Sequence, residues 1–288
     1  MANPVAFITG ASRGIGAETA VALARDGYDV GITARSLNDG EVFDHNGILA
    51  PLPGSLHATA AKVEAYGRRA LCLKADILDE KGTVDALRQT QETFGRIDVL
   101  FNNATYQGIG NMEPVLELTR EHFDAIYQAN IFSPLALIKT AIPLMQQQGG
   151  GTIINMLSAT AFTDPPAPPS AGGWGFAYAS SKAALGRLAG CLLAEHAGAG
   201  LRIFNTEPGT VITEVMKQAG IAEMILKYAN PCPAVAVAEV IARLCQRDPE
   251  PDWLSDGVLH LPAIARELNL LDAPSLLDES LETGHGGD

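Results

Sequence analysis

The feature that most constrains the fold of this chain is a glycine-rich turn near its start. A short apolar run, Val5–Ile8, leads into Thr9-Gly-Ala-Ser-Arg-Gly-Ile-Gly16, and an apolar-periodic segment follows. A strand, a glycine turn and a helix together can bind phosphate, because the helix N-terminus offers free N–H groups and the positive end of its dipole. We expect Gly10 to permit the tight turn, Gly14 to let backbone approach a pyrophosphate, and Gly16 to let helix and strand pack closely. The alternative is an ordinary glycine-rich loop.

Length and composition place this turn at the head of one α/β domain. A chain of 288 residues with 47% hydrophobic residues can bury one sizeable core, and short apolar runs alternate with helical patterns after the turn. This alternation predicts a single doubly wound parallel sheet of the Rossmann type, with helices on both faces. The expected strands cover 5–8, 28–33, 70–74, 97–101, 152–156, 201–207 and 258–261, and further helices are expected at 55–66 and 234–243.

Charge and apolar patterning exclude several classes of partner. The formal net charge is -13, whereas nucleic acids and anionic membranes both require a basic face, so neither is expected as a partner. No apolar run approaches the ~18 residues of a membrane span, and the first residues lack the pattern of a signal peptide. Four cysteines and six histidines occur without disulfide or metal-ligand spacing. We therefore expect a cytoplasmic protein without a metal.

A tyrosine and a lysine four residues apart carry the clearest chemical signal. In a helix, Tyr178 and Lys182 share one face, which sets a phenol beside an ammonium group. A nearby cation favours phenolate, so we expect Lys182 to lower the pKa of Tyr178 and make it a general acid and base near neutral pH. The spacing alone also fits a surface helix with a solvated lysine.

The glycine turn and this pair together resemble the short-chain dehydrogenase/reductase family. The glycines stand at Gly-x-x-x-Gly-x-Gly spacing, Tyr-x-x-x-Lys lies downstream, and the resemblance covers about residues 5–261. Further landmarks follow in family order: Asp76, Asn102-Asn103-Ala104, Asn130, Ser158 and Pro208-Gly-Thr-Val-Ile-Thr213. The resemblance implies an NAD(P)-dependent oxidoreductase that interconverts a carbonyl and a secondary alcohol.

The same resemblance implies a role for each catalytic candidate. Ser158 would hydrogen-bond the substrate oxygen, and Tyr178 would give or take its proton. Lys182 would lower the tyrosine pKa and hold the cofactor ribose, and Asn130 would connect Lys182 to solvent through a water. A merely satisfied buried asparagine is the alternative for Asn130. Ser170 is a rival serine, but Ser158 follows a buried strand, which is a more rigid mount.

Two arginines predict the choice of nicotinamide cofactor. Arg35 follows the second expected strand, where a carboxylate would favour a free 2′-hydroxyl, and Arg13 lies in the glycine turn. Together they favour NADP(H) over NAD(H), although each could be a solvated surface charge. Asp76 could instead cap the next helix. The cofactor contacts that the resemblance implies are Gly10, Ser12, Arg13, Gly14, Ile15, Gly16, Arg35, Ser36, Asp76, Ile77, Asn103, Ala104, Tyr178, Lys182, Pro208, Gly209, Val211 and Thr213.

Three segments of the expected catalytic domain, 1–261, are individual to this chain. Residues 37–54 form an insertion rich in turn formers, predicted to be a surface flap near the adenine end. Residues 159–177 form a long proline- and glycine-rich loop, predicted to wall the substrate pocket with Trp174 and Phe176. Residues 212–233 are expected to form a lid.

The chain also departs from the family at a single position and at its end. Thr105 stands where the family usually has glycine, which predicts a reshaped loop under the cofactor ribose. Residues 262–288 are expected to be an acidic extension beyond the domain.

The expected substrate is a small carbonyl compound or alcohol with a mainly apolar body. Two alternatives stay open: a regulatory sensor that binds NADP(H) without turnover, and a 3-ketoacyl-thioester reductase. The helices that carry Asn130 and Tyr178 have apolar residues on more than one face, which predicts a homodimer or homotetramer packed through them.

Overall fold

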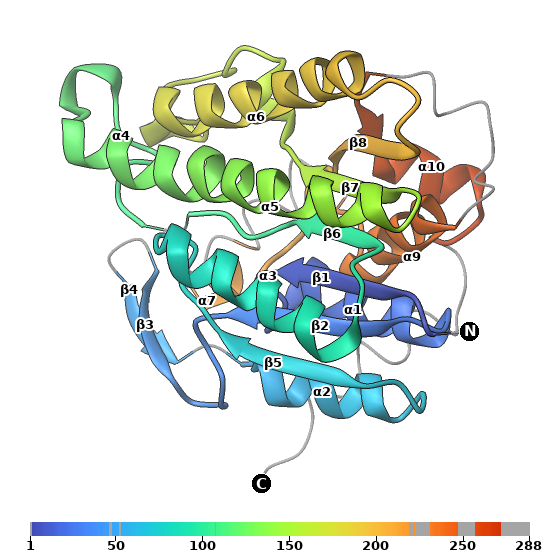
Figure 1. The fold of residues 1–288 in the computed structure, drawn as a ribbon. Helices are drawn as coiled ribbons and strands as arrows, with labels where there is room; N and C mark the ends of the chain where they lie inside the picture. Colours follow the sequence, from blue (N-terminus) through green and yellow to red (C-terminus); the bar gives the residue numbers. More distant parts are fainter. Residues whose placement is uncertain are drawn as a thin grey trace, which may run out of the picture.

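A seven-stranded parallel sheet forms the centre of the molecule (Figure 1). The computed structural model describes residues 2–45, 48–51, 53–106, 108–218, 222, 231–246 and 257–271. The strand order is β5-β2-β1-β6-β7-β8-β9, and every neighbouring pair is parallel. These strands are β1 (Val5–Thr9), β2 (Asp29–Ala34), β5 (Ala70–Lys74), β6 (Val99–Asn102), β7 (Gly151–Met156), β8 (Leu201–Glu207) and β9 (Leu259–His260). The predicted doubly wound sheet is confirmed.

Helices cover both faces of this sheet. They are α1 (Gly14–Arg25), α2 (Leu56–Glu64), α3 (Glu80–Phe94), α4 (Arg120–Tyr127), α5 (Ser133–Gln147), α6 (Phe176–Glu195), α7 (Glu214–Gln218), α9 (Ala234–Cys245) and α10 (Leu261–Glu267). A π-helical turn, Gln128–Phe132, joins α4 to α5. Helices α1, α2, α9 and α10 pack on one face, whereas α3, α5 and α6 pack on the other.

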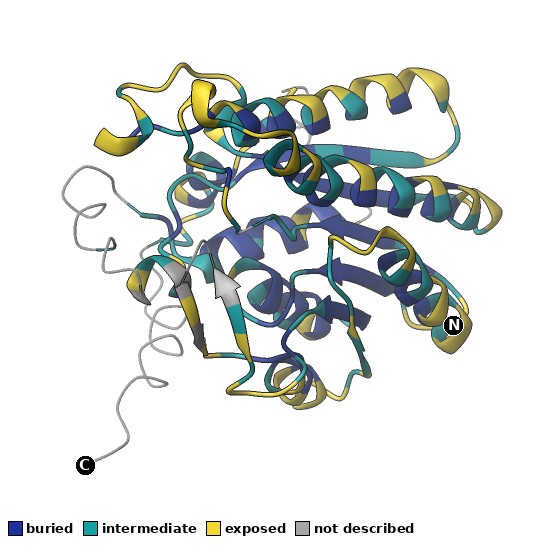
Figure 2. Ribbon diagram, turned by 90° about the vertical axis from the view of Figure 1, so that its left-hand side faces the viewer, coloured by how far each residue is buried: buried dark blue, intermediate teal, exposed yellow. Residues whose placement is uncertain are grey.

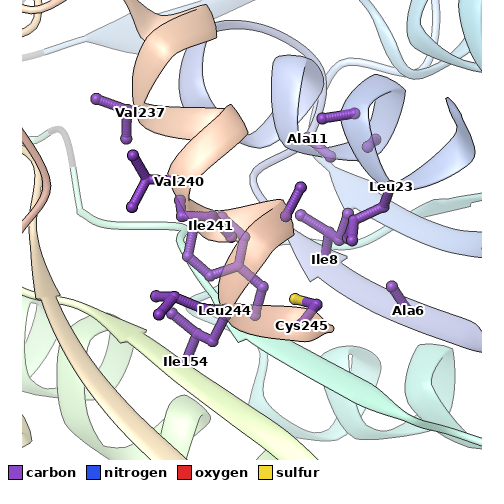
Figure 3. Packing of buried hydrophobic residues seen from close by; sticks show 14 of the residues in the cluster. Ala6, Ile8, Ala11, Leu23, Ile154, Val237, Val240, Ile241, Leu244 and Cys245 are labelled. Atoms are coloured by element: carbon purple, nitrogen blue, oxygen red, sulfur yellow. The ribbon is translucent and has the colours of Figure 1, made fainter. Parts of the chain in front are cut away.

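The alternation of side chains along β1 divides the core into two parts. Ala6 and Ile8 point into a cluster with α1 and α9, and Val5 and Phe7 point into a cluster with α3 and α5. Figure 3 shows the first cluster, in which side chains of α9 lie over the sheet. Because both faces are covered, the central strands are buried, and the exposed residues lie on the outer sides of the helices, on loops and on the hairpin (Figure 2).

The carboxyl ends of the central strands define where a ligand can bind. From β1 the chain first adds β2 and β5 on one side, and then adds β6, β7, β8 and β9 on the other. This reversal opens a crevice beyond the carboxyl ends of β1 and β6, which is where open parallel sheets bind their ligands. The glycine turn follows β1 at this edge.

The insertion at 37–54 contains more regular structure than predicted. It forms a two-stranded antiparallel hairpin of β3 (Val42–His45) and β4 (Ile48–Pro51), separate from the main sheet (Figure 1). The segment predicted as a surface flap therefore has regular structure that its sequence did not indicate. The abundance of turn formers concealed two short strands, because the described turn formers collect at the ends of the hairpin, as Gly40 with φ 79° and Gly54 with φ 89° do.

The folded domain also continues beyond residue 261, where we expected it to end. Helix α10 buries Leu261, Ile264 and Ala265 in the cluster with α9. The rest of the expected extension, 272–288, lies outside the described residues, as do 219–221 and 223–230 of the expected lid. Within the described part of the chain, no helix has the length and apolar character needed to cross a membrane.

Candidate active site

The glycine turn is built as tightly as its sequence predicts. Gly10 has φ 70°, and a Cβ on Gly16 would lie 2.4 Å from the carbonyl oxygen of Gly10. Asn103, at the end of β6, donates through Nδ2 to the carbonyl oxygens of Thr9 (2.9 Å) and Gly10 (3.2 Å). Above Gly14, with φ 56°, a Cβ would meet no described atom within 4 Å. Asn103 thus holds one side of the turn in place, and the side at Gly14 is open where a phosphate would approach.

Arg13 braces the hairpin. Its backbone caps α1, while its guanidinium donates to Pro53 O (2.9 Å), Gly54 O (2.9 Å) and Ser36 Oγ (3.0 Å). Burial, and then the charge of Arg35, lower the pKa of Arg13. The side chain of Arg13 therefore has a structural role, because the end of the insertion supplies two acceptors and Ser36 supplies a third.

Arg35 lies against the inserted hairpin. Its guanidinium carbon is 4.9 Å from the centroid of the Phe43 ring, and Lys74 Nζ is 5.9 Å from the same ring. Lys74 also donates to Glu41 Oε2 at 2.6 Å. The hairpin thus holds Arg35 at the end of β2, where the adenosine ribose of a dinucleotide would lie.

Tyr178 is half-buried near the start of α6 and has two hydroxyl partners. Its side chain forms hydrogen bonds with Ser158, which follows β7, and with Thr105, which follows β6. Burial raises the pKa of Tyr178 and the carboxylate of Glu207 raises it further, while the two hydroxyl groups act in the opposite direction. The predicted lowering of this pKa by Lys182 is wrong for this structure. The two residues share a helix face as expected, but the hydroxyl groups, burial and Glu207 determine the shift.

Lys182 points its ammonium group at the backbone of β7. The side chain is 2% exposed, and Nζ donates to Met156 O at 2.9 Å. Nζ lies 5.8 Å from the centroid of the Tyr178 ring. Burial lowers the pKa of Lys182 to about 8. The bland alternative of a solvated surface lysine is thereby excluded.

Asn130 lies in the π-helical turn between α4 and α5, and its side chain joins three parts of the site. Oδ1 accepts from Thr105 Oγ1 (3.0 Å) and from the backbone N–H of Tyr106 (3.0 Å), and Nδ2 donates to Ser181 Oγ (3.0 Å). Ser181 in turn donates to the carbonyl oxygen of Tyr178 at 2.7 Å. The amide therefore ties the loop after β6 to the helix that carries Tyr178.

Sequence reasoning did not anticipate a row of buried asparagines beneath the site. Asn102, Asn155 and Asn205 occupy the same register on β6, β7 and β8. Asn102 donates to Asn155 at 2.9 Å, Asn155 to Asn205 at 3.3 Å, and Asn205 to the carbonyl oxygen of Gly186 on α6 at 2.7 Å. The signal was present in the sequence, because each asparagine stands near the end of an expected strand. The sequence alone does not show, however, that the three asparagines share a register, because this depends on how the strands align in the sheet.

The structure also places the remaining cofactor candidates along the same edge. Asp76 accepts from the backbone N–H of Leu78 at 2.9 Å, and Asp79, not Asp76, caps α3. Ile77 O accepts from Ser133 Oγ at 2.7 Å. After β8, the N–H of Gly209 donates to Glu207 Oε1 at 2.8 Å, and Thr213 Oγ1 accepts from the N–H of Met216 at 3.3 Å. The other candidates in these loops are Ser12, Ile15 and Ser36, of which Ser12 and Ser36 are buried, together with Ala104, Pro208 and Val211.

Trp174 and Phe176 do not lie beside Tyr178. They line a cavity of about 780 Å³ together with Phe162, with Pro165, Pro168 and Pro169, and with the α6 residues Ala179, Ser180 and Ala183. Along α6, Ala179, Ser180 and Ala183 are turned to a different side of the helix from Tyr178 and Lys182. Phe176 packs edge-on against Phe123 of α4, with 5.8 Å between ring centroids. Gly175 N donates to Asn111 O at 3.1 Å, which ties the end of the proline-rich loop to the segment before α4.

Comparisons with known proteins agree with this arrangement. The family model of short chain dehydrogenases matches residues 4–47 and 45–223. An uncharacterized oxidoreductase of Methylorubrum extorquens is 34% identical over 76% of this chain and 77% of its own length. Oxidoreductase UcpA of Salmonella typhimurium is 30% identical over 99% of this chain and 98% of its own length. Among solved structures, acetoin dehydrogenase from Enterobacter cloacae is 27% identical with a TM-score of 0.69, covering 90% of this chain and 94% of that one.

The fold, the site and these matches define an oxidoreductase that acts on CH–OH groups with NAD(P). The chain belongs to the short-chain dehydrogenase/reductase family.

Proposed function

We propose that this protein reduces a ketone or aldehyde to an alcohol with NADPH, and that Tyr178 gives the proton. The observation that carries the proposal is the position of the Tyr178 side chain, which is hydrogen-bonded to Ser158 and Thr105 with the buried Lys182 beside its ring. A hydroxyl group held in this way is positioned for general acid and base catalysis.

The residues present fit a nicotinamide dinucleotide. The cradle formed by Gly10, Gly14 and Gly16 opens onto the N-terminus of α1, which suits a pyrophosphate. Asn103 holds that cradle, and Lys182 is the candidate partner of the nicotinamide ribose. When bound, the nicotinamide supplies or accepts the hydride.

The side chains of this chain handle the substrate oxygen and its proton. Ser158 orients the oxygen by a hydrogen bond, which leaves the Tyr178 proton aimed at it. In reduction, the phenol O–H bond breaks and a new O–H bond forms on the substrate oxygen. The ammonium group of Lys182 adds positive charge beside the resulting phenolate.

The preference for NADPH is supported by Arg35. Its guanidinium is permanently charged and planar, it lies at the end of β2, and Phe43 supports it from one side. The neighbouring Lys74 adds a second cation on the same ring. Arg13 donates to the end of the insertion, so Arg35 is the arginine that we propose for the 2′-phosphate.

We also propose a substrate with a mainly apolar body, a homo-oligomeric assembly and a cytoplasmic location. Ile109 and Met112, on the loop after Tyr106, are 48% and 43% exposed and offer apolar surface to the body of a substrate. We also propose a homodimer or homotetramer packed through α5 and α6. All four cysteines are free thiols, which supports a reducing compartment, the cytoplasm.

Replacement of the phenol hydroxyl tests the proposed chemistry. In Tyr178→Phe, turnover of a ketone panel with NADPH should fall by a factor of ~10² or more while NADPH affinity stays nearly unchanged, because only the proton donor is lost. Tyr127→Phe is the matched control, since its hydroxyl donates to Ser180 Oγ at 3.0 Å, away from the catalytic face of α6. Retained turnover in Tyr178→Phe would rule out this proton donor. Tight NADPH binding with no turnover by the wild type would favour a sensor.

A further inference from the structure

Thr105 links the proton-bearing hydroxyl of the site to the π-helical turn. It occupies a position where glycine was expected from the family resemblance, and its side chain has two partners. Oγ1 lies 3.0 Å from Asn130 Oδ1, and the same hydroxyl group is hydrogen-bonded with Tyr178. A glycine at this position could make neither bond.

The direction of these bonds follows from the partners of Asn130. The backbone N–H of Tyr106 approaches the same Asn130 atom at 3.0 Å, and an N–H group can only donate. That atom is therefore the amide oxygen, and the Thr105 hydroxyl donates its proton to it. Toward Tyr178, Thr105 presents lone pairs, so it can accept the phenol proton until a substrate oxygen takes that proton instead.

The direction of the hydrogen bond between Thr105 and Tyr178 can reverse once Tyr178 has lost its proton. A phenolate can only accept hydrogen bonds, and it needs a donor where it previously had an acceptor. Ser158 is then engaged with the substrate oxygen. Thr105 can turn its O–H bond about Cβ–Oγ1 toward the phenolate, and Asn130 Oδ1 still keeps the N–H of Tyr106 as a partner.

We propose that Thr105 stabilises the Tyr178 phenolate by turning its hydroxyl from Asn130 to the phenolate oxygen. The proposal rests on the proposed function of Tyr178 as proton donor. The transferred proton moves from the Tyr178 oxygen to the substrate oxygen, and Thr105 keeps its own proton throughout. The two hydroxyl groups thus have different roles. Ser158 orients the substrate oxygen, and Thr105 donates a hydrogen bond to the phenolate.

The charged groups around Tyr178 allow this hydroxyl to be tested separately. Lys182 faces the ring from the same helix, and Glu207 acts on it from the end of β8. A substitution at Thr105 changes neither charge. A change in the titration of Tyr178 therefore reports the loss of the hydroxyl.

Three substitutions distinguish a hydroxyl effect from a packing effect. Thr105→Val keeps the shape without the hydroxyl, Thr105→Ala removes the hydroxyl with less bulk, and Thr105→Ser keeps the hydroxyl. In Thr105→Val, kcat should fall by about 10-fold or more, the typical loss when a hydrogen bond to a charged group is removed. The pH profile of kcat/KM should move toward higher pH in Thr105→Val and Thr105→Ala, and Thr105→Ser should restore both values.

A second readout does not need turnover. Tyrosine labelled with a heavy carbon isotope at Cζ reports its own ionisation by NMR, and the Tyr178 signal is the one missing from Tyr178→Phe. Its titration should move to higher pH in both hydroxyl-free variants. Wild-type rates and an unmoved titration in Thr105→Val and Thr105→Ala would overturn the proposal. If Tyr178→Phe itself kept full turnover, the proposed function would fail instead.

Discussion

At the scale of single residues, the site is governed by burial more than by the pairing of charges. Lys182 and Tyr178 lie on one face of α6, yet burial lowers the pKa of the lysine to about 8 and raises that of the tyrosine. Lys182 contacts the backbone of β7 and not the phenol oxygen. The helical spacing correctly predicted that Tyr178 and Lys182 are neighbours, but it did not predict that burial determines their pKa values.

The depressed pKa of Lys182 predicts a pH-dependent cost of folding. The folded chain releases this proton near pH 8, whereas an unfolded lysine releases it near the ordinary value of 10.5. Below pH 8 the full cost of burying the charge applies. Between pH 8 and 10.5 the unfolded state binds more protons, so the free energy of unfolding should rise with pH, by up to about 3 kcal/mol from this group.

Urea denaturation of the wild type and Lys182→Met across this range measures the effect. The stability of the wild type relative to the variant should improve as pH rises from 8 to 10.5. Other titrating groups occur in both proteins, so they cancel in the comparison. A stability difference that stays constant with pH would contradict the depressed pKa.

At the scale of elements, the inserted hairpin connects cofactor preference to the fold. Arg35→Asp should weaken NADPH binding by at least ~10-fold, about 1.4 kcal/mol, and improve NADH binding relative to it. Phe43→Leu removes only the ring beneath Arg35, so it should weaken NADPH binding by roughly 2- to 5-fold and leave NADH unchanged. Fluorescence titration with both cofactors measures each change.

A matched aromatic pair elsewhere supplies the control for this prediction. Arg69 lies over the Phe94 ring at 4.6 Å, next to the start of β5 and not at the end of β2. Phe94→Leu should therefore leave the ratio of the two affinities unchanged. Equal titration of the wild type by NADPH and NADH would remove the assigned role of Arg35.

The elements that the sequence predicted well are those with a local signal. The buried strands, the glycine turn and the helix beginning near Ser55 follow from apolar runs, φ requirements and side-chain chemistry within a few residues. The hairpin, the bracing role of Arg13 and the asparagine row depend on contacts between distant segments. The cavity that Trp174 and Phe176 line depends on such contacts too, and their role in substrate binding stays a prediction.

At the scale of the whole molecule, α6 has an outward face of mostly small and apolar residues, with the exposed Arg187 among them. Its outward residues include Ala183, Ala184, Gly190, Cys191 and Leu193, all exposed, and Leu193 is 45% exposed. Small side chains let two helices approach closely, and apolar side chains gain free energy when covered. The arrangement supports a symmetric assembly in which α6 meets its copy.

Gly190 allows the assembly to be tested without disturbing the chain itself. A Cβ at Gly190 would meet no described atom within 4 Å, so Gly190→Glu should fold normally and gain helix propensity, worth up to about 1 kcal/mol. On a helix that packs against its copy, the same side chain would place like charges together and block close approach. Light scattering should therefore give two or four times the 30.3 kDa chain mass for the wild type and for Gly190→Ala, but one chain mass for Gly190→Glu. A monomeric wild type at micromolar concentration would contradict the assembly, and an oligomeric Gly190→Glu would move the interface away from α6.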